Sequence, residues 1–165
     1  MITILEATTK DIKIIQEITY KTWPITYSKI LSKKQLDYML DLIYSDEALS
    51  SQIEKKEQLF YLISEDEINL GFIGIEHHYK NETVTRIHKI YLLPETQGKG
   101  IGKKVIEEIQ KLALENHSTS LSLNVNRFNS ALSFYKKIGF QIIGEVNIDI
   151  GNGYLMEDYV MEKKL

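Results

Sequence analysis

The sequence Gln97-Gly98-Lys99-Gly100-Ile101-Gly102 lies between a predicted strand and a predicted amphipathic helix. Residues 86–93 before it form an apolar, β-branched and aromatic run that stops at Pro94, as a strand would. Three alternating glycines expose the first N–H groups of the helix, at the positive end of its dipole. The stretch therefore predicts a cradle for a phosphate or pyrophosphate. The helix after it is predicted by apolar residues at helical spacing, namely Ile101, Val105, Ile106, Ile109, Leu112 and Ala113.

Composition limits the class of protein. With 165 residues, 43% of them hydrophobic and 26% charged, the chain is expected to form one globular domain over residues 1–165. Lys and Arg number 20 against 23 Asp and Glu, so the basic surplus of a nucleic-acid-binding protein is missing. The absence of cysteine excludes disulfides, thiolate catalysis and Cys-ligated metal sites. No long apolar span and no leader pattern is present, so we expect no membrane association and a cytoplasmic location.

The pattern along the chain predicts a mixed α/β (or α+β) domain. Capping boxes at Thr8/Asp11 and Ser32/Gln35 open two helices, and Trp23-Pro24 is expected to end the first of them. Further helices are predicted after Ser45, after the glycines and from Asn129. Strands are predicted near residues 2–6, 59–63, 70–79, 83–93, 121–125, 141–150 and 155–162.

The glycine stretch fits neither of two common nucleotide-binding motifs. A P-loop requires G-x-x-x-x-G-K-[ST], and the residue five before Gly102 is Gln97. A Rossmann fingerprint would begin at Gly98 and Gly100, but its third glycine position falls on Lys103. Taken alone, the stretch is also compatible with a tight connection between a strand and a helix.

A second block narrows these possibilities. Residues 124–129 read Asn-Val-Asn-Arg-Phe-Asn, and residues 129–140 read Asn-x-Ala-x-x-Phe-Tyr-x-x-x-Gly-Phe up to Phe140. Together with Gln97, Gly100 and Gly102, this block resembles the signature of the GCN5-related N-acetyltransferase (GNAT) superfamily, and loosely its bacterial polyamine acetyltransferases. The resemblance implies a central, mostly antiparallel, twisted sheet that splays between strands 4 and 5 and is flanked by helices.

The resemblance also implies a coenzyme, acetyl-CoA, as co-substrate and no metal. In the family the coenzyme enters where the sheet splays. Asn129 is then expected to hydrogen-bond the pantetheine or phosphate region besides capping its helix. Charge contacts from Lys99, Lys103 or Lys137 are possible, although a solvated surface position suits each lysine as well. Main-chain groups of Ile90, Tyr91 and Leu92 would pair with the pantetheine arm, and the pyrophosphate would meet Gln97, Gly98, Lys99, Gly100, Ile101, Gly102 and Lys103.

The same resemblance suggests catalytic groups. An amine acceptor must lose a proton before it attacks, and the leaving thiolate must gain one. Tyr135 matches the family's tyrosine near the coenzyme sulfur and is the candidate general acid. Asn124 stands where ribosomal-protein N-terminal acetyltransferases carry a glutamate, and an amide cannot take a proton. His88 is the candidate general base, since imidazole has a suitable pKa, although it could equally be a packed strand residue.

The predicted function is acetyl transfer to a primary amine, a small amine or polyamine, by direct attack in a ternary complex. A protein N-terminus or lysine is the alternative acceptor, and a non-catalytic acyl-CoA sensor is the alternative from another class. Aromatic residues that could line an acceptor pocket through cation–π contacts are Trp23, Tyr27, Tyr38 and Tyr154. By resemblance, pairing through the C-terminal strands would make the protein a homodimer.

Overall fold

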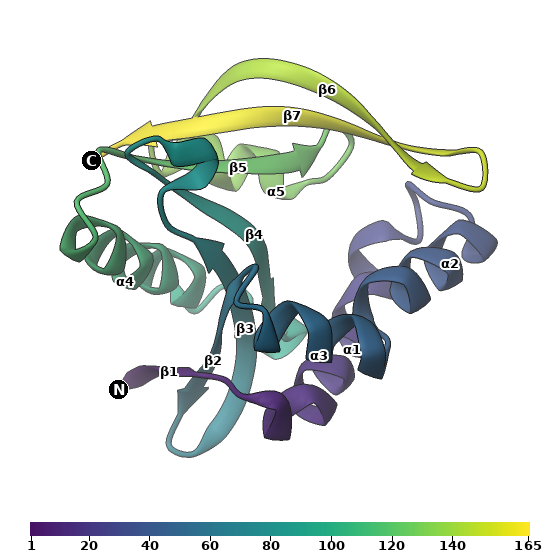
Figure 1. The fold of residues 1–165 in the computed structure, drawn as a ribbon, viewed down its shortest axis with the longest axis horizontal. Coiled ribbons are helices and arrows are strands. Elements are labelled where there is room, and N and C mark those ends of the chain that lie inside the picture. The colour runs from purple at the N-terminus through teal and green to yellow at the C-terminus, as the bar shows by residue number, and fades with distance from the viewer. The chain divides into compact units, whose positions relative to one another are not determined.

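The computed structural model describes residues 1–165, and its strands pair in the order β1-β2-β3-β4-β5-β7-β6 (Figure 1). Strands β4 and β5 run parallel, whereas the pairs β1–β2, β2–β3, β5–β7 and β6–β7 are antiparallel. The mixed, mostly antiparallel sheet predicted from the sequence is therefore confirmed. The strands are β1 (Ile2–Glu6), β2 (Leu59–Glu65), β3 (Ile68–Glu76), β4 (Val84–Leu92), β5 (Ser120–Asn126), β6 (Gln141–Gly151) and β7 (Tyr154–Lys164). The helices are α1 (Ile12–Tyr27), α2 (Lys33–Tyr44), α3 (Asp46–Glu54), α4 (Ile101–Glu115) and α5 (Ala131–Lys137).

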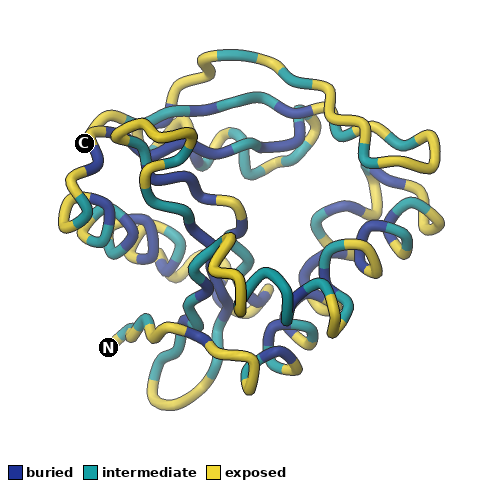
Figure 2. The backbone as a smooth tube through the Cα atoms, in the orientation of Figure 1, coloured by how far each residue is buried: buried dark blue, intermediate teal, exposed yellow.

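The chain divides into two compact units. Unit 1 comprises Met1–Glu76 and His88–Ile109, and unit 2 comprises His77–Ile87 and Gln110–Leu165. In unit 1, helix α1 contacts β3, α2 and α3. Burial follows the helical period along these helices (Figure 2), because one face of each is apolar. The fully buried side chains of this core include Ile15, Met39, Leu49, Phe60, Ile63, Phe72, Ile73 and Ile75.

The expectation that Pro24 ends the first helix is wrong, because α1 continues to Tyr27. Proline removes the N–H that would bond the carbonyl of Tyr20. Both Pro24 and Tyr20 lie on the exposed side of the helix, where water can satisfy that carbonyl. The next turn closes normally, since the Ser28 N–H donates to the Pro24 carbonyl at 3.0 Å. A proline on the solvent side can thus be accommodated inside this helix.

Most of the predicted helix signals are confirmed. Thr8 and Asp11 form the capping box, although it opens a short 3-10 turn (Thr9–Asp11) that leads directly into α1. The Ser32 hydroxyl accepts from the Gln35 N–H at 3.1 Å, and Ser45 caps α3 in the same way. Strand β3 ends at Glu76, three residues earlier than expected, because His78 turns into the left-handed region with φ 54°.

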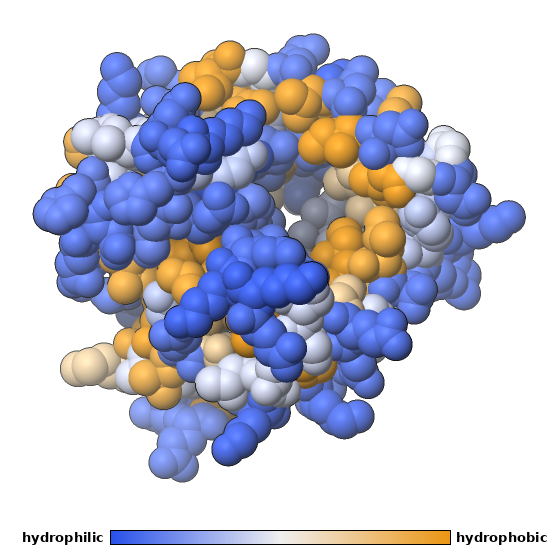
Figure 3. Space-filling model, in the orientation of Figure 1, coloured by the Kyte–Doolittle hydropathy of each residue, from blue (hydrophilic) through white to orange (hydrophobic).

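Unit 2 is built on two long antiparallel strands. Strands β6 and β7 form a hairpin around Asn152, and β7 also pairs with β5. The parallel ladder between β4 and β5 runs from Val84↔Ser120 to Ile87↔Leu123 and ends there, so Asn124 is the first β5 residue beyond it. Strand β6 is an edge of the sheet. Figure 3 shows hydrophobic side chains along this hairpin, and the exposed ones on β6 are Ile142, Ile143 and Ile148.

Candidate functional site

The glycine stretch in unit 1 forms an exposed loop that ends in helix α4. Gly98 and Gly100 adopt φ values of 78° and 71°, a region that disfavours side chains. A Cβ atom added at either glycine would meet no protein atom within 4 Å. Conformation rather than crowding therefore requires these glycines, and the space beside their backbone is open.

Three N–H groups in and beside the loop already have acceptors in the chain, and one of them, that of Lys99 between the glycines, donates to the Thr96 carbonyl at 3.3 Å. Gln97 donates to the Pro94 carbonyl at 3.1 Å, and Lys104 donates to the Gly100 carbonyl at 3.3 Å. The N–H groups of residues 101–103 belong to the first turn of α4, where a helix has no internal acceptors. Together with the helix dipole, these donors give the loop the chemistry of an anion site. Lys99 and Lys103 are both exposed beside them.

The end of β4 packs closely on β3. The Leu93 N–H donates to the Leu70 carbonyl at 2.8 Å, and a Cβ added to Gly71 would lie 2.2 Å from the Tyr91 carbonyl oxygen. Glycine at position 71 is therefore required for the two strands to approach. Ile90, Tyr91 and Leu92 are each half-buried here.

Two aromatic residues predicted for an acceptor pocket belong to the core of unit 1. Trp23 and Tyr27 are buried, with ring centroids 4.8 Å apart. The Tyr27 hydroxyl lies 3.3 Å from the hydroxyl of Tyr91. Tyr44 joins this cluster, and burial raises the pKa of its phenol well above the usual value. The aromatic cluster thus anchors β4 to α1 and α2.

His88, the candidate base, is exposed on β4 and has an acidic neighbour. Its Nε2 lies 3.0 Å from Oε1 of Glu76 on β3. A carboxylate at this distance accepts from one ring nitrogen and so fixes the tautomer of the imidazole. The sequence offered no signal for this pairing, because it depends on the register of β3 against β4.

Lys89, the next residue on β4, was missed by the sequence analysis. Its ammonium is buried, donates to the side-chain oxygens of Gln52 and Gln58 at 2.9 and 2.8 Å, and lies 5.1 Å from the ring centroid of Phe60. Burial lowers the pKa of Lys89 to about 7, opposed by the charge of Glu57. The only sequence signal was a lysine at an inward position of an apolar strand.

We expect the free energy of unfolding to rise with pH between about 7 and 10.5 because of Lys89. In this window the unfolded chain binds the proton and the folded chain does not, so folding becomes more favourable by up to about 1.4 kcal/mol per pH unit. Urea unfolding at several pH values measures this slope. Lys89→Met should remove it, whereas Lys34→Met at an exposed position should not. Equal slopes in the wild type and Lys89→Met would contradict the burial of a neutral lysine.

Unit 2 holds the other predicted site residues. Tyr135 on α5 is buried, and its ring packs against Phe134 and Phe140 at centroid distances of 5.4 and 5.7 Å. The Asn129 side-chain oxygen accepts from the Ala131 N–H at 2.9 Å, so it caps the start of α5 as expected, although the helix itself begins two residues later. Lys137, at the other end of α5, is exposed.

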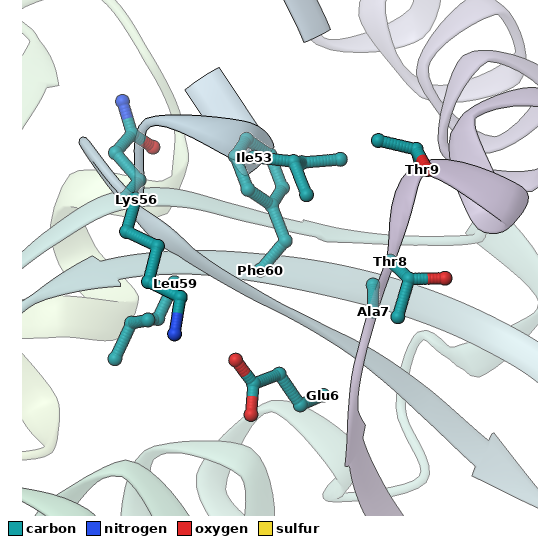
Figure 4. Close-up of a pocket in the computed structure, with 9 residues that line it drawn as sticks. Glu6, Ala7, Thr8, Thr9, Ile53, Lys56, Leu59 and Phe60 are labelled. Carbon is teal, nitrogen blue, oxygen red and sulfur yellow. The ribbon is translucent and has the colours of Figure 1, made fainter. Parts of the chain in front are cut away.

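A hollow in unit 1 contains none of the predicted site residues. It has a volume of about 260 Å³ and opens between the turn before α1 and the end of α3 (Figure 4). Glu6, Thr8, Ile53 and Lys56 line it, together with Phe60.

No group of three or more His, Asp or Glu side chains is arranged to hold a metal ion. No helix is both long and apolar enough to cross a membrane.

Comparison with known proteins shows the family of this chain. A family profile described as "Acetyltransferase (GNAT) domain" matches residues 28–163. The chain belongs to the GNAT acetyltransferase family. This GNAT protein is 29% identical over 160 residues to a spermidine N(1)-acetyltransferase of Thermoplasma acidophilum, a match that covers 94% of the chain and 92% of the relative.

Other relatives of this GNAT acetyltransferase differ in their named acceptors. A peptidyl-lysine N-acetyltransferase, YjaB of Salmonella typhimurium, is 29% identical over 110 residues, which is 66% of the chain and 68% of the relative. Among solved structures, the PaiA N-acetyltransferase of Thermoplasma acidophilum in complex with coenzyme A is 28% identical. It superposes with a TM-score of 0.82 over 100% of this chain and 99% of its own.

Proposed function

We propose that this chain transfers the acetyl group of acetyl-CoA to a primary amine, a small amine or polyamine, by direct attack in a ternary complex. The observation that carries the proposal is the glycine loop, where two left-handed glycines leave open space beside donors at the start of α4. The spermidine acetyltransferase and the coenzyme A complex among its relatives support the choice of acceptor and donor. Residues 1–165 act as one acetyltransferase domain in this proposal.

The proposed donor site combines backbone and side-chain groups. The pyrophosphate of acetyl-CoA meets residues 98–103 through N–H groups other than that of Lys99, which donates to Thr96. The main chain of residues 90–92 pairs with the amides of the pantetheine arm. Asn129 contributes a side-chain hydrogen bond from its amide nitrogen, since its oxygen is already used by Ala131. Three exposed ammonium groups partly offset the negative charge of the phosphates from the protein surface, those of Lys99, Lys103 and Lys137.

The proposed chemistry needs one base and one acid. His88, held by Glu76, takes a proton from the acceptor ammonium, and the neutral amine attacks the thioester carbonyl carbon. The carbon–nitrogen bond forms, the carbon–sulfur bond breaks, and the coenzyme leaves as a thiolate. The attacking nitrogen loses its second proton to solvent as it becomes an amide. Tyr135 gives its phenolic proton to that thiolate and is reprotonated from solvent. No covalent intermediate with the protein is needed, which agrees with a chain that contains no cysteine.

We expect His88→Asn to reduce kcat/KM for the amine about 100-fold at neutral pH. The loss should shrink toward pH 10, because the acceptor then loses its proton to solvent without a base. Initial rates of thiol release across pH measure both effects. His117→Asn, the same change at an exposed residue after α4, is the matched control. A uniform loss at every pH would contradict the role of His88 as a base.

The acceptor is tested by thiol release from acetyl-CoA across spermidine, spermine, arylalkylamines, aminoglycosides, amino acids and short peptides. We expect turnover with a small amine or polyamine. Turnover with peptides alone would favour the lysine or N-terminal alternative, which the peptidyl-lysine relative supports. Coenzyme binding without turnover of any amine would favour an acyl-CoA sensor.

We also infer a cytoplasmic location and pairing of two chains through β6. The edge position of this strand and its exposed Ile142, Ile143 and Ile148 support pairing, since an uncovered apolar edge strand readily pairs with another strand.

A further inference from the structure

Three polar side chains of unit 2 gather where the parallel ladder ends. Asn124 and Asn126 follow the last ladder pair on β5, and Asp158 on β7 lies directly opposite Asn126 in the antiparallel register. Asn126 and Asp158 are each only 6% exposed. The Oδ1 atoms of Asn124 and Asp158 are both buried, and neither has a hydrogen-bond partner. The strand register places both side chains on the same face of neighbouring strands. Buried oxygens without a partner are uncommon, because burying such a group costs free energy.

We propose that Asp158 and Asn124 form the subsite that binds the ammonium group of a cationic primary-amine acceptor. An ammonium has three N–H donors and no acceptor, which is the complement of a carboxylate oxygen and an amide oxygen. The subsite rests on the proposed function, in which the acceptor is a primary amine that binds as an ammonium. In this proposal, Asp158 and Asn124 select a charged amine over a neutral acceptor.

The charges around Asp158 are consistent with this role. Burial raises the pKa of its carboxyl group, while the charges of Arg86 and Arg127 lower it. Each arginine has other partners: Arg86 donates to Ser122 at 3.2 Å and lies over the ring of Tyr79. Burial is the larger effect, so the pKa of Asp158 is raised overall; the two arginines offset part of that effect, and neither occupies its Oδ1 atom.

The Arg127 side chain contacts residues of β6 and β7. It donates to the side-chain oxygen of Asn147 at 2.7 Å, lies 3.8 Å from a carboxylate oxygen of Glu145 and stacks over Tyr159. The Glu145 side chain is largely exposed, and the buried Nε of Arg127 has no hydrogen-bond partner. An incoming ammonium adds one positive charge beside an unused carboxylate oxygen, where a charged hydrogen bond is strong.

The test compares Asp158→Asn with Glu157→Gln, a neighbouring and exposed carboxylate on the same strand. The probe is spermidine, or the amine of the panel with the highest kcat/KM if spermidine is not turned over. We expect Asp158→Asn to lower kcat/KM for the amine about 10- to 100-fold, mainly through KM. The affinity for acetyl-CoA, measured by calorimetry, should stay within about twofold. Glu157→Gln should behave as the wild type.

The possible results distinguish a failure of the proposed subsite from a failure of the proposed function. A wild-type chain that releases no thiol with any amine would overturn the proposed function and the subsite with it. An active wild type whose Asp158→Asn variant keeps its kcat/KM, or loses acetyl-CoA binding equally, would overturn the subsite alone. Should Asp158→Asn fail to fold, Asn124→Ala provides the same comparison, and an unchanged KM for the amine in that variant would overturn the proposal.

Discussion

Replacing Tyr135 by phenylalanine is expected to reduce kcat by a factor of about 10² to 10⁴. The substitution keeps the ring that packs against Phe134 and Phe140, so α5 and its surroundings should remain folded. It removes only the hydroxyl that would protonate the leaving thiolate. Because this proton transfer occurs in the transition state, the affinity for acetyl-CoA should change little. Steady-state kinetics together with calorimetry of acetyl-CoA measure the two quantities.

The matched control is Tyr20→Phe, which makes the same chemical change at a tyrosine of α1 that is 52% exposed. It should leave kcat and the affinity for acetyl-CoA at wild-type values. A wild-type kcat in Tyr135→Phe at neutral pH would reject Tyr135 as the proton donor. A parallel loss of acetyl-CoA affinity would instead assign the hydroxyl to binding.

Gly100→Val is expected to weaken acetyl-CoA binding by at least about 100-fold, since several charged hydrogen bonds to the pyrophosphate are lost together. Two effects act on the loop. A β-branched residue is strained at a φ of 71°, and its side chain fills the open space beside the donors. Calorimetric titration of the variant with acetyl-CoA gives the change in affinity directly.

Gly153→Val distinguishes these two effects. Gly153 has a φ of 78°, and a Cβ there also meets open space, but it lies in the turn between β6 and β7. Both variants should lose a similar amount of stability, about 1–3 kcal/mol from backbone strain. Only Gly100→Val should lose affinity. Equal affinities in the two variants and the wild type would contradict the cradle formed by the glycine loop.

Local sequence patterns predicted the order of helices and strands well, because caps, turns and apolar periods are encoded within a few residues. The capping residue Thr8 and the turn at Asn152 are of this kind. Pro24 was misread, because its effect depends on which side of α1 faces solvent. The order of the strands in the sheet could not be derived from local patterns, and the resemblance to the GNAT superfamily implied only a mostly antiparallel sheet that splays between strands 4 and 5.

For the site residues too, local sequence patterns predicted local features but not contacts between distant segments. Gly98 and Gly100 were found from the sequence because a required backbone conformation restricts the residue type. Glu76 and Asp158 were not found, since their neighbours His88 and Asn126 become close only through strand register. Lys89 was overlooked because two glutamine side chains from other segments satisfy its buried ammonium. Contacts of this kind depend on tertiary structure, which a single sequence does not display.

The most direct test of the central claim is calorimetric titration of the wild-type chain with acetyl-CoA. We expect saturable binding of one coenzyme per chain, and competition by free coenzyme A because both carry the same pyrophosphate and pantetheine arm. No heat and no shift in thermal unfolding at saturating acetyl-CoA would contradict the proposed donor site and, with it, the acetyl transfer built on the glycine loop.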